Sequence, residues 1–148
     1  MKRIVTCAVY VVALLLLEAT VRAQGFPAVI GAWTGTVSYV SEGSGYGSGP
    51  YSLNLTNQSG NLLMGFVVQP GGGDTNGMTG YLLASKYVVG AFDIAVSVSG
   101  TNNFPGYVAT GLLRTNTQTI ARFAVSIPGC ENCENNNVSA TGTLRKKP

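Results

Sequence analysis

Two cysteines, Cys130 and Cys133, are the residues whose type and spacing most directly suggest chemistry. A Cys-x-x-Cys pair can form a disulfide, exchange with other thiols or bind a metal. Thiol exchange usually requires a cysteine activated at a helix N-terminus, and structural zinc usually takes four ligands. The sequence predicts no helix near this pair and no complete ligand set. We therefore predict a structural disulfide between Cys130 and Cys133 and no metal site, with redox activity and metal binding as the alternatives.

Catalysis by other groups is restricted by composition. The chain has no histidine. This absence excludes a Ser-His-Asp catalytic triad or a Cys-His catalytic dyad, and it removes the commonest acid-base group at neutral pH. An enzyme would have to use carboxylates, and Asp93 is the one that lies within a predicted strand. It alternates with Phe92 and Ile94, so we expect it to face solvent if those two residues are core. We predict no catalytic residue, no cofactor and no enzymatic activity.

The first 23 residues predict a secretory signal peptide. Lys2 and Arg3 precede an apolar run over residues 4–17, and Val21 and Ala23 suit signal peptidase. This run is shorter than the roughly 20 residues of a membrane-spanning helix. We expect cleavage after Ala23 and a secreted protein, or a periplasmic one in a bacterium, with no membrane span in the mature chain. An uncleaved anchor is the alternative. Disulfides persist in such oxidising compartments.

Residues 24–148 predict one domain of low net charge. After removal of residues 1–23, six basic residues face five acidic ones, a net charge of 6−5 = +1. A net charge this low provides no basic surface of the kind that binds nucleic acid. We therefore do not expect nucleic acid as a partner. The length suits a single hydrophobic core.

The alternation of apolar and polar residues predicts an all-β fold with no helix. We expect eight strands, at residues 32–40, 51–57, 61–68, 78–85, 87–98, 107–114, 119–127 and 138–145. An antiparallel meander of eight strands can close into an up-and-down β-barrel, which removes exposed strand edges. A β-bulge could locally exchange the inner and outer faces of a strand.

A Thr-Gly-x-Leu pattern supports this meander. It begins at Thr79, Thr110 and Thr141, with a constant interval of 31 residues, which fits two strands and two turns. The glycine of each copy shares a strand face with apolar residues, so we expect it to point inward. Such a glycine either lets the strand coil sharply or leaves room for a ligand, and we favour coiling.

The connections between the predicted strands alternate in length. The long ones cover residues 41–50, 69–77, 99–106 and 128–137. In a meander these four connections meet at one mouth of the barrel, which makes the mouth a candidate binding site. The alternative is that they are simple flexible connections.

Gly31-Ala32-Trp33 opens the first predicted strand, and here the chain resembles the calycin barrels, the group of lipocalins and avidins. The resemblance implies a tryptophan that plugs the barrel floor, with Arg114 or Arg145 as counterparts of the arginine that covers it. The chain lacks a lipocalin Thr-Asp-Tyr motif, and Thr34-Gly35-Thr36 replaces the residues with which avidin holds biotin, so biotin binding is not expected. Small barrels of this kind also include secreted protease inhibitors.

These observations predict a secreted, non-catalytic binding protein that holds a small apolar ligand in the barrel or at the long-loop mouth. The alternative is a protein with a filled barrel that acts through its surface on an extracellular partner, as a protease inhibitor or an envelope or matrix component. The candidate ligand-binding residues are the aromatic ones expected inside: Trp33, Tyr39, Tyr51, Phe66, Phe92, Tyr107 and Phe123.

Three asparagines match the N-glycosylation pattern, which is relevant if the source is a eukaryote: Asn54, Asn57 and Asn137. If Asn54 faces outward, its neighbours Leu53 and Leu55 face inward, together with Tyr51.

Overall fold

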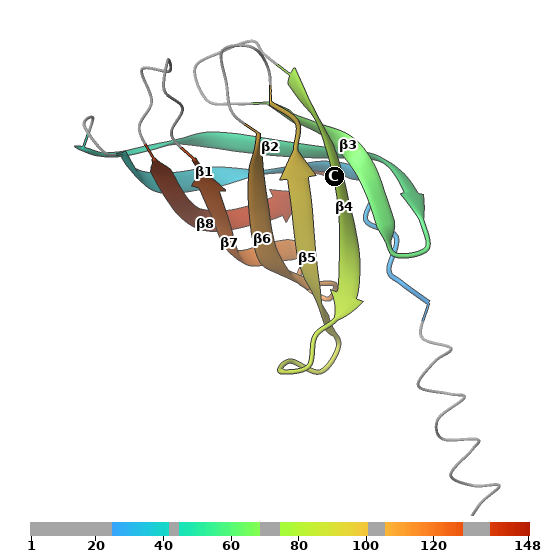
Figure 1. Cartoon of the computed structure of the whole chain (residues 1–148). Helices are drawn as coiled ribbons and strands as arrows, with labels where there is room; N and C mark the ends of the chain where they lie inside the picture. The colour runs from blue at the N-terminus through green and yellow to red at the C-terminus, as the bar shows by residue number, and fades with distance from the viewer. Residues whose placement is uncertain (1–24, 42–44, 69–74, 101–105, 129–136) are drawn as a thin grey trace, which may run out of the picture.

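Eight antiparallel strands form a closed barrel in the computed structural model, which describes residues 25–41, 45–68, 75–100, 106–128 and 137–148. Each strand pairs with the next one in sequence, and the last pairs with the first, as Figure 1 shows. The strands are β1 (Gly31–Ser41), β2 (Gly45–Ser59), β3 (Leu62–Val68), β4 (Thr75–Ala84), β5 (Ala91–Val98), β6 (Tyr107–Arg114), β7 (Thr119–Ile127) and β8 (Val138–Lys146). The predicted eight-stranded meander is confirmed. The described residues contain no helix long and apolar enough to cross a membrane.

The alternation of side chains creates an apolar interior. In β1, Trp33 and Val37 are buried, and in β4 Met78 and Leu82 are buried. Tyr51, Leu53 and Leu55 of β2 are also buried, as expected if Asn54 faces the other way. These inward residues belong to one continuous core cluster, so a single core fills the barrel.

Two bulges interrupt the regular pairing, and the one in β7 shifts its register with both β6 and β8. In β2 the shift lies between Leu55 and Asn57, and in β7 it lies between Ile120 and Phe123. Arg122, inside the second shift, has a φ of 51°, in the left-handed region. Ile120 and Phe123 are three residues apart and would face opposite sides of a regular strand, yet both are buried. The bulge turns both inward and leaves Arg122 exposed.

Two strand boundaries, the starts of β2 and β5, differ from the sequence prediction by four residues or more. Residues 45–50, expected in a long loop, extend β2 and pair with β1. A Cβ atom at Gly47 would lie 2.5 Å from the hydroxyl oxygen of its cross-strand partner Tyr39, so this glycine makes room for the tyrosine ring. Residues 85–90, expected to be mostly strand, form the turn between β4 and β5, where Gly90 has a φ of 74°.

The glycines of the repeated Thr-Gly pattern lie where neighbouring strands approach closely. A Cβ atom at Gly142 would lie 2.6 Å from the Thr36 carbonyl oxygen and 2.9 Å from Val37 Cγ1. At Gly111 it would lie 2.6 Å from Ile120 Cγ2, and at Gly80 2.7 Å from Val96 Cγ1. These positions have no room for a methyl group, still less for a ligand. The contacts support sharp coiling of the strands as the role of the repeat.

The close approach at Gly142 predicts that Gly142→Ala destabilises the barrel by about 2 kcal/mol, because the methyl group would push β8 away from β1. Gly77→Ala is the matched control, since a Cβ atom there has only Ser99 Oγ in reach, at 4.0 Å. Urea unfolding of both variants measures the difference. Equal stability of Gly142→Ala and the unsubstituted protein would contradict the coiling role.

Candidate functional site

Six of the seven aromatic residues predicted to line the barrel point into it. Trp33, Tyr51, Tyr107 and Phe123 are buried, whereas Tyr39 and Phe92 are half-buried and pack against the core. Phe66 was expected inside, but it lies on the outer face of β3, because its strand neighbours at the inner positions are the buried Leu63 and Val67. The continuous apolar run of β3 gave no alternation from which to choose the face.

Aromatic side chains meet each other across the interior. The hydroxyl groups of Tyr51 and Tyr107 form a buried hydrogen bond of 2.9 Å, and the ring centroids of Tyr51 and Phe123 are 5.0 Å apart. Burial, which removes the phenolate from water, is the main cause that raises the pKa of Tyr51 and of Tyr107 above 10.0. Side chains that contact each other in this way occupy the centre that a ligand would need.

The N-terminal segment closes the floor of the barrel around Trp33, which is only 1% exposed. The indole Nε1 donates to the Val29 carbonyl oxygen at 2.9 Å. The Val29 amide donates to the side-chain oxygen of Gln58 at 3.0 Å, and the Gln58 amide nitrogen donates to the Pro27 carbonyl oxygen at 2.9 Å. The predicted role of Trp33 as a floor residue is therefore consistent with the structure.

The cation above Trp33 is Lys146, and not Arg114 or Arg145 as the resemblance implied. Its Nζ lies 5.8 Å from the centre of the tryptophan ring, within the range of a cation–π interaction. Lys146 is two residues from the buried Leu144 and therefore lies on the same, inner face of β8. Arg114 and Arg145 are exposed on the outer face. Strand parity in the sequence was the signal that could have identified Lys146.

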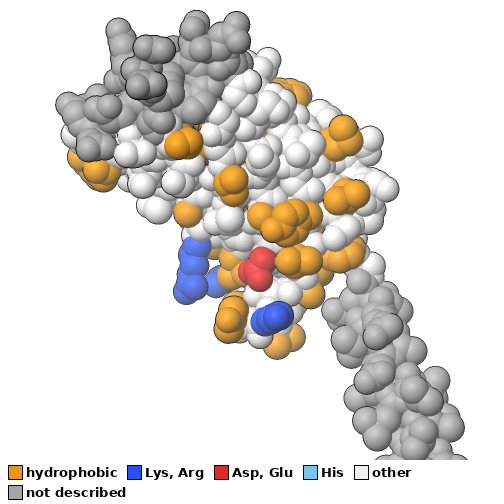
Figure 2. All heavy atoms as spheres, viewed as in Figure 1, with side chains coloured by type: hydrophobic (Ala, Val, Ile, Leu, Met, Phe, Trp, Pro, Cys, Tyr) orange, Lys and Arg blue, Asp and Glu red, His pale blue; other side chains and the backbone are white. Residues whose placement is uncertain are grey.

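The outer wall of the barrel carries a concentration of exposed apolar side chains that the sequence reading missed. They come from the outer faces of β3 to β6 and from the turn between β4 and β5: Leu62, Met64, Tyr81, Leu83, Tyr87, Val89 and Val108. We call this set the apolar wall. Figure 2 shows hydrophobic side chains gathered on this side of the molecule. Strand pairing aligns Leu62 with Tyr81 and Tyr81 with Ala95, so an apolar row runs from β3 to β5.

Two open grooves follow the apolar wall. One, of about 340 Å³, extends across β4 to β7 and includes Leu83, Leu112 and Arg122. The other, of about 430 Å³, extends across β3 to β6 and includes Leu62 and Val108. Tyr81 and Ala95 line both grooves, so the grooves adjoin. The arrangement can bind an apolar surface, and its chemistry is that of burial and shape.

Asp93 lies at the edge of the apolar wall, exposed as predicted. It is the only acidic side chain among the described residues. Asn57 and Asn137 are exposed and Asn54 is half-buried, with its amide 3.3 Å from Ser52 Oγ. The predicted signal peptide and the predicted disulfide between Cys130 and Cys133 lie outside the described residues.

Comparison with protein-family models, curated proteins and solved structures found no significant match for this chain. The structure shows a closed eight-stranded barrel. Membership of the calycin group stays a prediction.

The buried tyrosine pair predicts a loss of stability in alkali. Both tyrosines stay protonated in the folded protein where an unfolded tyrosine ionises, near pH 10.0. Stability should therefore be unaffected by this pair below that pH and fall as the pH rises above it. Urea unfolding at increasing pH measures the fall, which should be smaller in a Tyr51→Phe, Tyr107→Phe double variant. An identical alkaline slope in the two proteins would contradict the assignment.

Proposed function

We propose that this chain is a secreted, non-catalytic binding protein that acts through the apolar wall on another extracellular protein. The observation that carries the proposal is the concentration of exposed apolar residues on one side of a barrel whose interior is already packed. Contiguous exposed apolar surface of this kind commonly marks an interaction site.

The packed interior favours a surface role over a ligand deep in the barrel. Trp33, Leu53 and Phe123 are almost completely buried by neighbouring protein atoms. The hydroxyl groups of Tyr51 and Tyr107 already form a buried hydrogen bond with each other. A ligand in this region would have to displace packed side chains, which costs free energy that a preformed pocket does not require.

The dimensions of the apolar wall favour a protein partner over a small molecule. It extends across β3 to β6, three interstrand spacings of about 4.8 Å, and continues onto the turn at residues 85–90. Tyr87 in this turn is 93% exposed. A small ligand would cover one groove and leave most of these residues in water, whereas a protein surface can bury the whole wall at roughly 25 cal/mol per Å² of apolar area.

Photo-crosslinking tests the proposal. A benzophenone amino acid at position 81, in protein secreted by its native host, should give a covalent adduct with the mass of a second protein, because Tyr81 lines both grooves. Tyr46 is the matched control, since it is 77% exposed but lies on β2, away from the apolar wall.

The adduct should disappear when Leu83→Glu is added, because the carboxylate would have to be buried in the interface. Denaturing mass spectrometry distinguishes the outcomes. Equal adducts at positions 81 and 46, or none at position 81, would refute the apolar wall as a binding surface. An adduct whose added mass is smaller than that of a protein would indicate that the apolar wall binds a small ligand instead.

A small ligand at the mouth of the barrel is the second candidate, and Asn76 is the observation that favours it. This residue lies at the inner face of β4, near the end where the long connections begin, and is 4% exposed. Its side chain makes no hydrogen bond within the described part of the chain. A buried amide without a partner costs about 1–3 kcal/mol, which a polar group of a ligand would offset.

Native mass spectrometry of the secreted protein tests this second candidate. A small bound mass that is lost on denaturation, and absent from an Asn76→Leu variant, would support it. If no mass is bound and Asn76→Leu is more stable than the unsubstituted protein, then no ligand uses this amide, and the candidate is refuted.

A further inference from the structure

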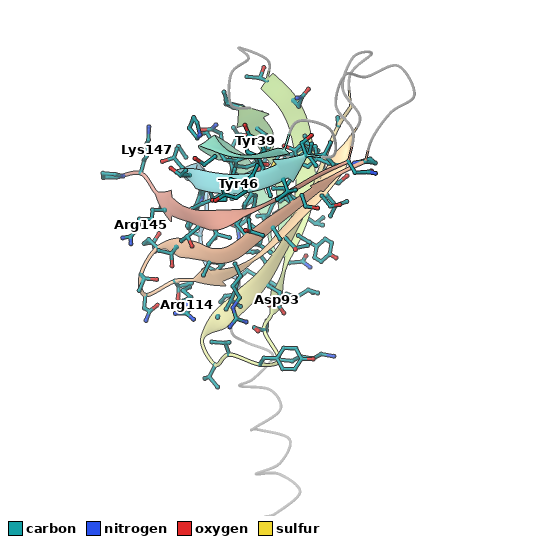
Figure 3. All side chains as sticks on the ribbon, turned by 90° about the vertical axis from the view of Figure 1, so that its left-hand side faces the viewer. Tyr39, Tyr46, Asp93, Arg114, Arg145 and Lys147 are labelled. Atoms are coloured by element: carbon teal, nitrogen blue, oxygen red, sulfur yellow. The ribbon has the colours of Figure 1, made fainter. Side chains whose placement is uncertain are left out.

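Basic side chains gather on the side of the barrel next to the apolar wall. The described residues include six basic side chains and one acidic one, Asp93. Three arginines, Arg114, Arg122 and Arg145, are exposed on the consecutive strands β6, β7 and β8. We call them the arginine cluster. Figure 3 shows Arg114 and Arg145 projecting from the same edge of the barrel. Asp93 lines the same groove as Arg122.

Strand pairing brings Arg114 and Arg145 to either side of one residue of β7. Thr119 of β7 pairs with Arg114 on one side and with Arg145 on the other. The backbones of these two arginines are thus two interstrand spacings apart, about 10 Å. Arginine side chains of this separation can direct their guanidinium groups at one small ion between them. Thr119 occupies the outer face of β7 between them and is nevertheless buried.

Arg122 joins this arrangement because of the bulge in β7. In a regular strand that kept Ile120 inside, residue 122 would also point inside. The left-handed backbone at Arg122, with φ of 51°, reverses its direction and places the guanidinium on the outer wall, three residues from Thr119. This conformation is unfavourable for a residue other than glycine or asparagine. A side chain at a strained backbone position often indicates a functional demand on that residue.

No carboxylate of the described residues forms an ion pair with the arginine cluster. Within the described residues, none of the three guanidinium groups takes part in an ion pair or a hydrogen bond. Their mutual repulsion is unfavourable, and a bound anion would remove it. Guanidinium groups present paired N–H donors whose geometry matches the oxygens of phosphate and sulfate groups.

We propose that the arginine cluster is a binding site for a tetrahedral oxyanion, the phosphate or sulfate group of a larger extracellular molecule. Arg114 and Arg145 bind it from two sides, and Arg122 binds it from the side of the apolar wall, whose first groove it also lines. The site adjoins the proposed protein-binding surface at Arg122, but binding of the anion does not depend on a protein partner.

Isothermal titration of the purified protein with inorganic phosphate tests the site. We expect saturable binding with one ion per chain at low ionic strength. Arg122→Gln and Arg145→Gln should each weaken it about tenfold, the effect of losing charge-assisted hydrogen bonds. Lys86→Gln is the matched control, because it removes the same charge from an exposed residue in the β4–β5 turn. Equal weakening by Lys86→Gln, or no saturable binding, would overturn the proposal.

A second variant separates binding from folding. Arg122→Gly suits the left-handed backbone, so its melting temperature should equal or exceed that of the unsubstituted protein while phosphate binding falls. Undiminished phosphate binding by Arg122→Gly would remove Arg122 from the site and overturn the three-arginine arrangement.

Vesicles distinguish the source of the anion. Co-sedimentation with phosphatidic acid vesicles, but not with phosphatidylcholine vesicles, identifies a lipid headgroup if Arg145→Gln abolishes it. Phosphate binding without vesicle binding assigns the site to a phosphate or sulfate group of a soluble molecule and excludes a lipid headgroup. Vesicle binding that Lys86→Gln and Arg145→Gln reduce equally reflects net charge alone and counts against the site.

Discussion

Closure of the sheet is the constraint on which the rest of this structure depends. β1 must pair with β2 on one side and with β8 on the other, and eight strands achieve this only by coiling strongly. The strands can coil in this way because glycine occupies their closest approaches, at positions 80, 111 and 142. Any side chain there would clash with the neighbouring strand. Once the sheet is closed, no strand edge is left unpaired among β1 to β8. Association with other molecules must therefore use side chains on the outer wall or groups at the two ends.

The closed sheet also separates two chemical environments. The inner face is mainly apolar, and two of its polar groups, the hydroxyls of Tyr51 and Tyr107, form a hydrogen bond with each other. The outer face divides into an apolar side on β3 to β6 and a cationic side on β6 to β8. Arg122 lies where the two sides meet, and it does so because one bulge keeps both Ile120 and Phe123 in the core. Core packing and surface chemistry are thus linked at a single residue.

The sequence predicted the barrel because alternation of side chains is a local pattern. The prediction of strands and of their inner faces failed where this alternation is absent. Residues 45–50 carry mostly glycine and serine and were read as a loop, although their backbone continues the pairing of β2 with β1. Phe66 was assigned inward because the apolar run of β3 offers both faces equally. The apolar wall depends on the mutual register of four strands, which aligns Leu62 with Tyr81 and Tyr81 with Ala95, and no single segment of sequence contains that information.

Trp33 is the only tryptophan in the chain, and it lies at the joint between β1, β8 and the N-terminal segment. Its indole is shielded from water and lies beneath the ammonium group of Lys146. The tryptophan fluorescence of this protein, as distinct from that of its seven tyrosines, therefore comes from the floor of the barrel alone. It reports whether the first and last strands are joined, because Trp33 lies where β1 pairs with β8. Separation of β1 from β8 can therefore be followed by the tryptophan emission of the unmodified protein.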